Sequence, residues 1–278
     1  MMSLFNRSCT DCSRIITQNY STSFTMGIKV FDKRFQDPIY GIYAYVRLAD
    51  EIVDTFHDKD KAALLREFKE DTIKAIERGI STNPVIHAFQ EVVRTYDIEW
   101  ELIEAFLQSM EMDLHPTDYN NKLYDHYIYG SAEVVGLMCL RVFCEGNRQQ
   151  YDQLREPARR LGAAFQKVNF LRDMKSDFEE RGRVYFPDVK FTCFDDESKK
   201  IIEQDIKSDF DAAYQGILQL PRGSQFGVYT AYKYYLNLFH KITHASPQKV
   251  LQERIRVANP QKMVILVKSM LRYQLNFL

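Results

Sequence analysis

Two pairs of aspartates have the spacing of one helical turn. Asp50 and Asp54 are four residues apart in YGIYAYVRLADEIVDTF, and Asp173 and Asp177 are four apart in NFLRDMKSD. On a helix, residues four apart share one face. Two carboxylates on one face offer the oxygen ligands that Mg²⁺ prefers, and this ion completes its coordination with water and substrate phosphate oxygens.

The first pair shares its helix face with mostly apolar residues, namely Ile39, Tyr43, Val46 and Arg47. Carboxylates on a face that turns toward a core are costly unless they are paired or bind a cation. Glu51 follows Asp50 directly, but helical geometry turns it about 100° away. We therefore do not count Glu51 as a ligand.

The second pair ends a ladder of polar residues. At spacings of four, three, four and four, one face carries Gly162, Gln166, Asn169, Asp173 and Asp177. These side chains offer amide and carboxylate oxygens, and the face has no long cationic residue. Arg172 lies beside it in the sequence.

If the two helices face each other, their carboxylates line one mouth. Neither pair includes histidine or cysteine, which disfavours zinc and iron. Nearby arginines can bind phosphate oxygens directly. The spacing thus favours a Mg²⁺-bridged diphosphate site, and a structural network of ion pairs is the alternative.

The elements that would position these residues are helices. Apolar residues recur at three and four positions nearly throughout the chain, and no alternating strand pattern appears. We predict one all-α domain over residues 1–278. The expected helices cover 38–57, with Pro38 in its first turn, and 61–79, 84–95, 99–114, 121–145, 151–180, 198–219, 222–244 and 246–275, with a loop at 181–198.

Composition excludes several classes of protein. The 278 residues include 37 basic and 38 acidic side chains, a balance that argues against a protein built mainly to bind nucleic acid. Only 11 Gly and 8 Pro disfavour an all-β fold with many turns. Five cysteines are an odd number and indicate a reducing compartment, and we expect Cys9 and Cys12 to be free thiols. With no signal peptide and no membrane-spanning run recognised, we expect a cytoplasmic protein.

These motifs, together with others along the chain, resemble those of the squalene/phytoene synthase family, and bacterial phytoene synthases above all. DEIVD and NFLRDMKSD, the latter followed by ERGRVYFP, are similar to its two aspartate-rich signatures. The remaining similar segments are YSTSF (20–24), YIYGSAEVVG (127–136), LPRGSQFGV (220–228) and RIRV (254–257). The similarity runs from about residue 18 to residue 268.

The resemblance implies an isoprenoid-synthase helical bundle around a central cavity. It implies two or three Mg²⁺ ions per site, with Mn²⁺ as a substitute, held by Asp50, Asp54, Asn169, Asp173 and Asp177. Diphosphate or prenyl contacts would come from Ser21, Ser23, Phe24, Tyr43, Arg47, Gln166, Asn169, Arg172, Tyr235 and Arg256. Tyr129 would lie in the cavity near the reacting carbons, and with the four aspartates it forms the expected catalytic set.

The implied reaction is head-to-head condensation of two allylic prenyl diphosphates through a cyclopropyl diphosphate. We favour phytoene from two geranylgeranyl diphosphates, without NADPH. The alternatives are dehydrosqualene or squalene from two farnesyl diphosphates, a head-to-tail prenyltransferase or terpene cyclase, and a non-enzymatic assembly factor of the same fold. The typical DDxxD and NSE-type motifs of head-to-tail enzymes and cyclases are missing. We expect no nucleic-acid partner and no obligate protein partner. The amphipathic segment 260–275 would allow peripheral membrane contact.

Overall fold

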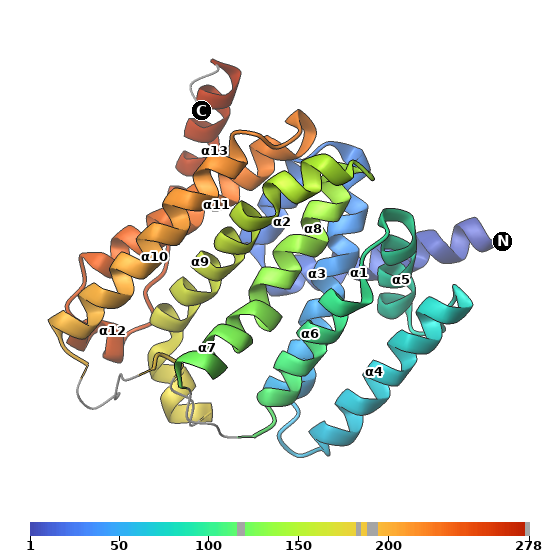
Figure 1. Cartoon of the computed structure of the whole chain (residues 1–278), viewed down its shortest axis with the longest axis horizontal. Coiled ribbons are helices and arrows are strands. Elements are labelled where there is room, and N and C mark those ends of the chain that lie inside the picture. The colour runs from blue at the N-terminus through green and yellow to red at the C-terminus, as the bar shows by residue number, and fades with distance from the viewer. Residues whose placement is uncertain (116–119, 182–184, 188–193, 276–278) are drawn as a thin grey trace.

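The computed structural model describes residues 1–115, 120–181, 185–187 and 194–275, and their regular structure is entirely helical (Figure 1). This confirms the predicted all-α class. The helices are α1 (Met2–Tyr20), α2 (Thr22–Lys29), α3 (Lys33–Asp54), α4 (Lys61–Arg78), α5 (Pro84–Tyr96), α6 (Trp100–Met112), α7 (Asn121–Ile128), the π-helix η1 (Tyr129–Glu133), α8 (Val134–Cys144), α9 (Arg148–Arg181), α10 (Asp196–Ile217), α11 (Arg222–Thr243), α12 (Pro247–Gln252) and α13 (Asn259–Gln274).

Long helices at the centre of the bundle carry the predicted acidic motifs. α8 packs against both α3 and α9, and α9 also packs along α10. α11 contacts α2, α9 and α13. In Figure 1, α4, α5 and α6 lie on one side of this group and α10, α12 and α13 on the other.

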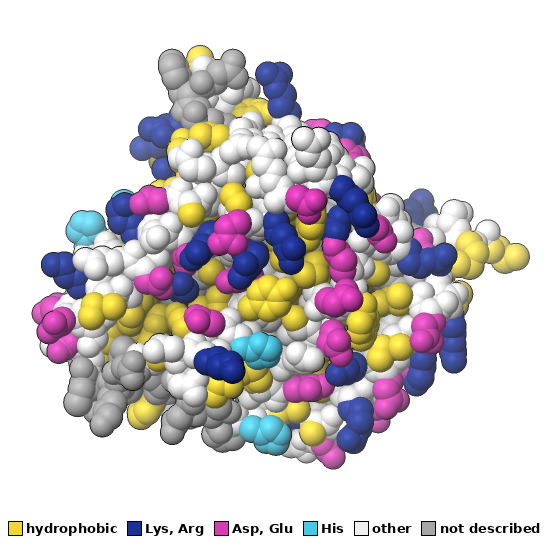
Figure 2. Space-filling view, in the orientation of Figure 1, with side chains coloured by type: hydrophobic (Ala, Val, Ile, Leu, Met, Phe, Trp, Pro, Cys, Tyr) yellow, Lys and Arg dark blue, Asp and Glu magenta, His cyan; other side chains and the backbone are white. Residues whose placement is uncertain are grey.

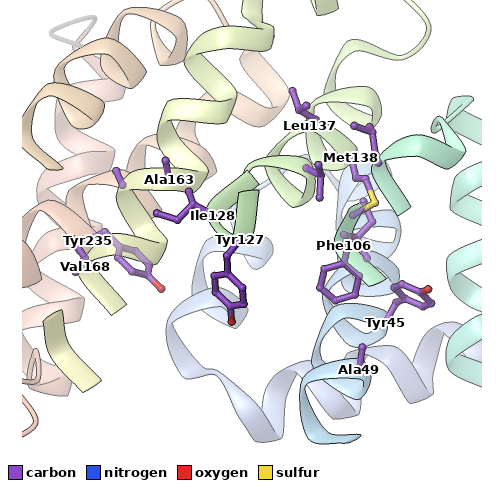
Figure 3. Close-up of a cluster of buried hydrophobic side chains, with 14 of the residues drawn as sticks. Tyr45, Ala49, Phe106, Tyr127, Ile128, Leu137, Met138, Ala163, Val168 and Tyr235 are labelled. Carbon is purple, nitrogen blue, oxygen red and sulfur yellow. The ribbon is translucent and has the colours of Figure 1, made fainter. Parts of the chain in front are cut away.

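A large apolar core joins these helices. Tyr45 of α3 is fully buried and stacks on Phe89 of α5, with ring centroids 3.8 Å apart. Its hydroxyl lies 3.2 Å from that of Thr72, so the buried polar group is satisfied. Figure 3 shows Tyr45 and Ala49 beside Phe106. Burying each such ring contributes about 2–3 kcal/mol, which holds α3 rigidly for the residues it carries.

Local signals set several helix ends. Ser21 starts α2 by accepting a hydrogen bond from Phe24 N at 3.2 Å. Asn83 starts α5 in the same way, with Pro84 at the first helical position. Gly79 ends α4 with a left-handed φ of 70°, which glycine adopts without steric cost.

The N-terminal helices were not among those predicted. The buried side of α1 consists of Cys9, Ser13 and Thr17, which are small and partly polar. This face gives a weak hydrophobic pattern, although small residues let α1 pack closely on α3 and α5. α3 also begins at Lys33, five residues earlier than predicted, so Pro38 lies inside the helix rather than in its first turn.

Two predicted helices are interrupted. The segment predicted as one helix over 121–145 contains the π-helix at 129–133, and the one predicted over 246–275 breaks into α12 and α13. Ser246 and Pro247 start α12, and an extended stretch follows it to Ala258. This stretch carries Arg254 toward α9.

The surface charge and the apolar helical segments are relevant to binding nucleic acid or a membrane. Figure 2 shows basic and acidic side chains interspersed over the visible face, which fits the near-zero net charge. Among the described residues, one helical segment, Asn121–Cys144, is long and apolar enough to cross a membrane by length and composition, with 56% of its most apolar window buried in the protein. The described cysteines, Cys9, Cys12, Cys139 and Cys144, are free thiols.

Candidate active site

A cavity of about 520 Å³ lies between α2, α3, η1, α8, α9, α10 and α11. α3 and α9 line it with apolar residues toward one end and with polar or charged residues toward the other, whereas the lining from α8 and α10 is apolar or small. The charged or polar lining residues include Ser21, Tyr43, Arg47, Asp50, Gln166, Asn169, Arg172, Tyr235 and Arg254. We call this end the mouth.

The opposite end of the cavity is apolar. Along α9 the lining runs from Arg172 at the mouth to Leu154, a span of about 27 Å at the helical rise. Phe31 and Phe143 pack on each other at this end, with ring centroids 5.2 Å apart. The cavity can therefore hold a ligand with an anionic head and a long apolar tail.

Helix α3 places Asp50 and Arg47 at the mouth. Arg47 pairs with Glu51, which is buried, and its guanidinium lies 4.4 Å from the centre of the Tyr20 ring. The Nε atom of Arg47 is buried without a hydrogen-bond partner among the described residues. Such a donor costs free energy unless an acceptor reaches it, as a phosphate oxygen would.

On α9, Asp173 lies between two arginines. Arg172 Nε donates to Asp173 Oδ1 at 3.0 Å, and Arg254 Nε reaches the same oxygen at 2.7 Å. Burial alone would lower the pKa of Arg172, but its hydrogen bond to Asp173 and the negative charge of that carboxylate together outweigh burial, and the pKa is raised. Both arginines line the cavity, so the second acidic motif brings fixed positive charge to the mouth.

The other two aspartates lie one turn beyond their partners. Asp54 is the last residue of α3, and Asp177 is buried on α9. Asp54, Asp173 and Asp177 are not among the residues that line the cavity, and the described residues contain no group of three His, Cys, Asp or Glu side chains close enough to hold a metal ion. The carboxylates thus flank the mouth from two helices without forming a closed protein cage.

This donor set fits Mg²⁺. The ion usually takes one or two carboxylates and leaves its other positions to water and substrate phosphates, so it does not need a cage made only of protein. Of the predicted ligands Asp50, Asp54, Asn169, Asp173 and Asp177, Asp50 and Asn169 line the mouth and Asp173 is bonded to two of its arginines. The unpartnered Arg47 Nε offers a place for a phosphate oxygen. Two or three ions held this way remain a prediction.

Tyr43 and Ser21 meet at the mouth. Burial raises the pKa of Tyr43 to about 12, although a hydrogen bond with Ser21 acts against this shift. The phenol is therefore neutral near pH 7. Ser23, which was predicted to contact diphosphate with Ser21, is not among the lining residues.

Below the charged groups the walls are aromatic. Phe24 lies 5.3 Å from Tyr43 and 6.2 Å from Tyr235, measured between ring centroids. Tyr235 stacks on Phe165 at 3.9 Å and donates a hydrogen bond to Asn169 Oδ1 at 3.4 Å. Aromatic faces attract cations without offering a nucleophilic lone pair at the contact.

Two residues predicted for the site are not among those that line the cavity. The first is Tyr129, whose ring centre lies 5.5 Å from the guanidinium of Arg159. Tyr127, two residues earlier, does line the cavity. Tyr127 donates a hydrogen bond to Asp113 Oδ2 at 2.7 Å, and Figure 3 shows it across from Tyr235. The helical rotation between positions 127 and 129 turns the second ring outward.

Arg256 is the second of these residues. Its side chain is exposed and absent from the lining, whereas Arg254 contributes to the mouth. Both arginines lie in the non-helical stretch between α12 and α13, where helical periodicity does not predict which side chain faces the cavity. Sequence reasoning missed Arg254 because it placed the segment in a helix.

Comparisons with known proteins give a consistent result. The squalene/phytoene synthase family model matches residues 17–261. A 15-cis-phytoene synthase of Synechocystis is 27% identical over 94% of this chain and 84% of its own length. A 4,4'-diapophytoene synthase of Staphylococcus haemolyticus is 26% identical over 75% of this chain and 72% of its own.

Solved structures share the fold. A dehydrosqualene synthase in complex with a ligand superposes with a TM-score of 0.81 at 19% identity, covering 97% of this chain and 98% of its own. A squalene synthase from Alicyclobacillus acidocaldarius gives a TM-score of 0.74 at 18% identity, covering 85% and 94%. At these identities, the structural matches establish the all-α isoprenoid-synthase fold alone.

Proposed function

We propose, because the chain belongs to the squalene/phytoene synthase family, that it joins two geranylgeranyl diphosphates head to head to form phytoene. The observation that carries this proposal is the cavity, which runs from an arginine- and carboxylate-lined mouth to an apolar end. Phytoene synthases among the relatives, such as those of Synechocystis and Enterobacter agglomerans, support this substrate.

The mouth residues would bind and orient the diphosphate groups. Arg47, Arg172 and Arg254 supply positive charge, and Ser21 supplies a hydroxyl. Because Asp173 already holds two of these arginines, a diphosphate oxygen would share or replace that partner without moving the guanidinium groups far. Fixed donors of this kind stabilise the charge that develops on a leaving group.

Mg²⁺, when bound by Asp50, Asp54, Asn169, Asp173 and Asp177, would neutralise the leaving diphosphate and so favour heterolysis of the C–O bond. The chain's own task is to present these oxygen donors beside the arginines. Placing both groups on the rigid helices α3 and α9 fixes that geometry before substrate arrives.

In the first half-reaction, the C1–O bond of one substrate breaks and the electron pair leaves with diphosphate. The double bond of the second substrate attacks the allylic cation, and loss of a proton closes the cyclopropyl ring. In the second half-reaction, the remaining diphosphate leaves, the ring rearranges to the 1′-1 linkage, and loss of a proton gives the central double bond. Two diphosphates and two protons are released for each hydrocarbon.

The cavity walls would protect these cations. Phe24, Phe165 and the neutral Tyr43 present rings rather than charged nucleophiles. The Cys139 thiol also lines the cavity, and burial raises its pKa to about 12, so it stays protonated and weakly nucleophilic. A dry apolar site of this kind limits trapping by water.

Dehydrosqualene synthesis from two farnesyl diphosphates is the second candidate, favoured by the similarity to the 4,4'-diapophytoene synthase. The test is to incubate the protein with Mg²⁺ and each diphosphate, with and without NADPH, and to analyse the extracted product by mass. Phytoene formed without NADPH supports our proposal. A thirty-carbon product overturns it in favour of the second candidate, and squalene would require NADPH.

We also propose that α13 rests on a membrane surface. Its exposed large apolar side chains are Met263, Val264, Val267, Met270 and Leu271. Residues 254–278 contain basic side chains and no acidic one, which suits anionic lipid headgroups. A membrane would also receive the hydrocarbon product.

A further inference from the structure

A second pocket, of about 560 Å³, lies between α11 and α13, which pack on each other at the edge of the bundle (Figure 1). Its basic and histidine lining residues are Lys233, His240, Lys268 and Arg272, and none of the described residues that line it is acidic. It shares no described lining residue with the active-site cavity, because α11 turns opposite faces to the two spaces. The pocket is thus a separate space suited to an anion.

The cations of this pocket lack acidic partners. Lys233 of α11 is half-buried, and burial together with the nearby charge of Arg272 lowers its pKa. Among the residues that the structure describes, no carboxylate forms an ion pair with Lys233, Lys268 or Arg272. Like charges brought together away from bulk water disfavour each other. An anion between them would relieve this cost.

Along α13, the pocket borders an exposed apolar face. Val264, Lys268 and Arg272 are spaced by four residues, so they share one side of the helix, and all three line the pocket. Val264 is also one of the exposed apolar side chains, with Val267 and Leu271. Cationic and apolar side chains therefore lie next to each other here, as the phosphate and the acyl chains do in a phospholipid.

We propose that this pocket binds the phosphate of an anionic phospholipid while the exposed apolar face of α13 enters the bilayer. Lys233, Lys268 and Arg272 would contact the phosphate, and the guanidinium can donate two parallel hydrogen bonds to it. The inference rests on the membrane contact proposed above and adds a defined headgroup site to it. Such a site differs from the diffuse attraction of any basic segment to an anionic surface.

The test compares two variants that each remove two positive charges from the C-terminal segment. Lys268→Gln/Arg272→Gln changes the pocket, whereas Arg256→Gln/Lys262→Gln changes basic residues that do not line it. Flotation with vesicles of equimolar phosphatidylcholine and phosphatidylglycerol measures binding. The pocket variant should bind about tenfold or more weakly than the control variant. Equal losses would indicate diffuse attraction and overturn the inference.

Lys233 tests the same pocket from the other helix. Lys233→Met should weaken binding to these vesicles about fivefold or more. Lys241→Met, on the same helix but outside the pocket, should have a smaller effect. Inorganic phosphate distinguishes a lipid headgroup from a free anion. If it binds the unsubstituted protein, binds the pocket variant more weakly and displaces the protein from the vesicles, the site takes a free anion and the phospholipid assignment is wrong.

Turnover without vesicles separates this inference from the proposed reaction. The pocket variant should couple prenyl diphosphates at the unsubstituted rate, because the pocket and the active-site cavity share no described lining residue. If the unsubstituted protein forms no hydrocarbon but the pocket variant selectively loses vesicle binding, the reaction is wrong and the headgroup site stands. If the unsubstituted protein does not bind the vesicles, the membrane contact and the headgroup site are both wrong. An unchanged melting temperature shows that each variant folds.

Discussion

Arg254 Nε lies 2.7 Å from Asp173 Oδ1, although the two residues are 81 positions apart in the sequence. The contact exists because the chain leaves helical geometry between α12 and α13 and crosses to α9. It places a half-exposed guanidinium at the mouth of the cavity, next to the more buried Arg172.

The first prediction concerns this arginine. Arg254→Ala should lower kcat/KM about 10- to 100-fold, the value of one charge-assisted hydrogen bond to a diphosphate. Arg256→Ala provides the matched control, because that side chain is exposed and outside the cavity. Steady-state kinetics that show equal losses in the two variants would contradict the placement of Arg254.

Asp50 and Glu51 are neighbours with different expected roles. Asp50→Asn should lower kcat about 10³-fold or more with little change in melting temperature, because it removes a charge that serves the bound metal and diphosphate. Glu51→Gln should instead destabilise the fold by about 1–3 kcal/mol, since it leaves the buried side of Arg47 uncompensated. Kinetics and thermal unfolding of both variants test this division. A scaffold without catalysis would tolerate Asp50→Asn in any functional assay.

Tyr43 gives a prediction about pH. Its pKa is raised from 10 to about 12 by burial, so the folded state favours the neutral phenol. The resulting stability is complete below the unfolded pKa near 10 and is lost as pH rises toward 12, on the order of 2 kcal/mol. Urea unfolding between pH 9 and 12 should show a smaller decline in Tyr43→Phe than in the unsubstituted protein. Equal slopes would show that Tyr43 does not contribute.

A buried ion pair joins α9, which carries the second acidic motif, to α10. Asp209 of α10 is fully buried, and Lys167 of α9 reaches its Oδ2 at 2.7 Å. Asp209→Ala should cost about 1–3 kcal/mol of unfolding free energy, because it removes a charged hydrogen bond from Lys167, which keeps Asp205 as a partner, and another from Arg160. Denaturant unfolding measures this loss, and Lys207→Ala, in an exposed pair on the same helix, should cost less than about 1 kcal/mol.

Binding to lipid tests the role of α13. Flotation with vesicles that contain anionic lipid should recover the protein, and recovery should fall when Val267 and Leu271 are replaced by glutamate. Replacement of Ile201, an exposed apolar residue on α10, serves as the control. Equal recovery of all three proteins would show that α13 is not the contact surface.

Much of this site could be predicted from spacing alone. Gln166 and Asn169 of the predicted ladder face the same mouth as Arg47 and Asp50, because helical periodicity fixes which residues share a face. Asp54, Asp173 and Asp177, which the same spacing grouped with them, are not among the lining residues. The arginines around Asp173 could not be derived in the same way. Arg254 depends on a break between helices, and Tyr127 rather than Tyr129 depends on the rotation of α7 as it enters the π-helix.

Helices that bury small or polar residues were harder to predict from the sequence. α1 buries Cys9, Ser13 and Thr17, and so lacks the apolar period that identifies a helix. Residues 182–184 of the ERGRVYFP segment, and Cys193, the fifth cysteine, lie outside the described residues. The organisation of residues 1–278 as one domain remains a prediction.

The central claim is that two prenyl diphosphates are coupled in this cavity. Its most direct test is a single incubation with geranylgeranyl diphosphate and Mg²⁺ in the absence of NADPH, in which hydrocarbon and inorganic diphosphate are both quantified. The account predicts phytoene with two diphosphates released for each molecule formed. Geranylgeraniol, with one diphosphate released for each molecule and no coupled hydrocarbon, would contradict it.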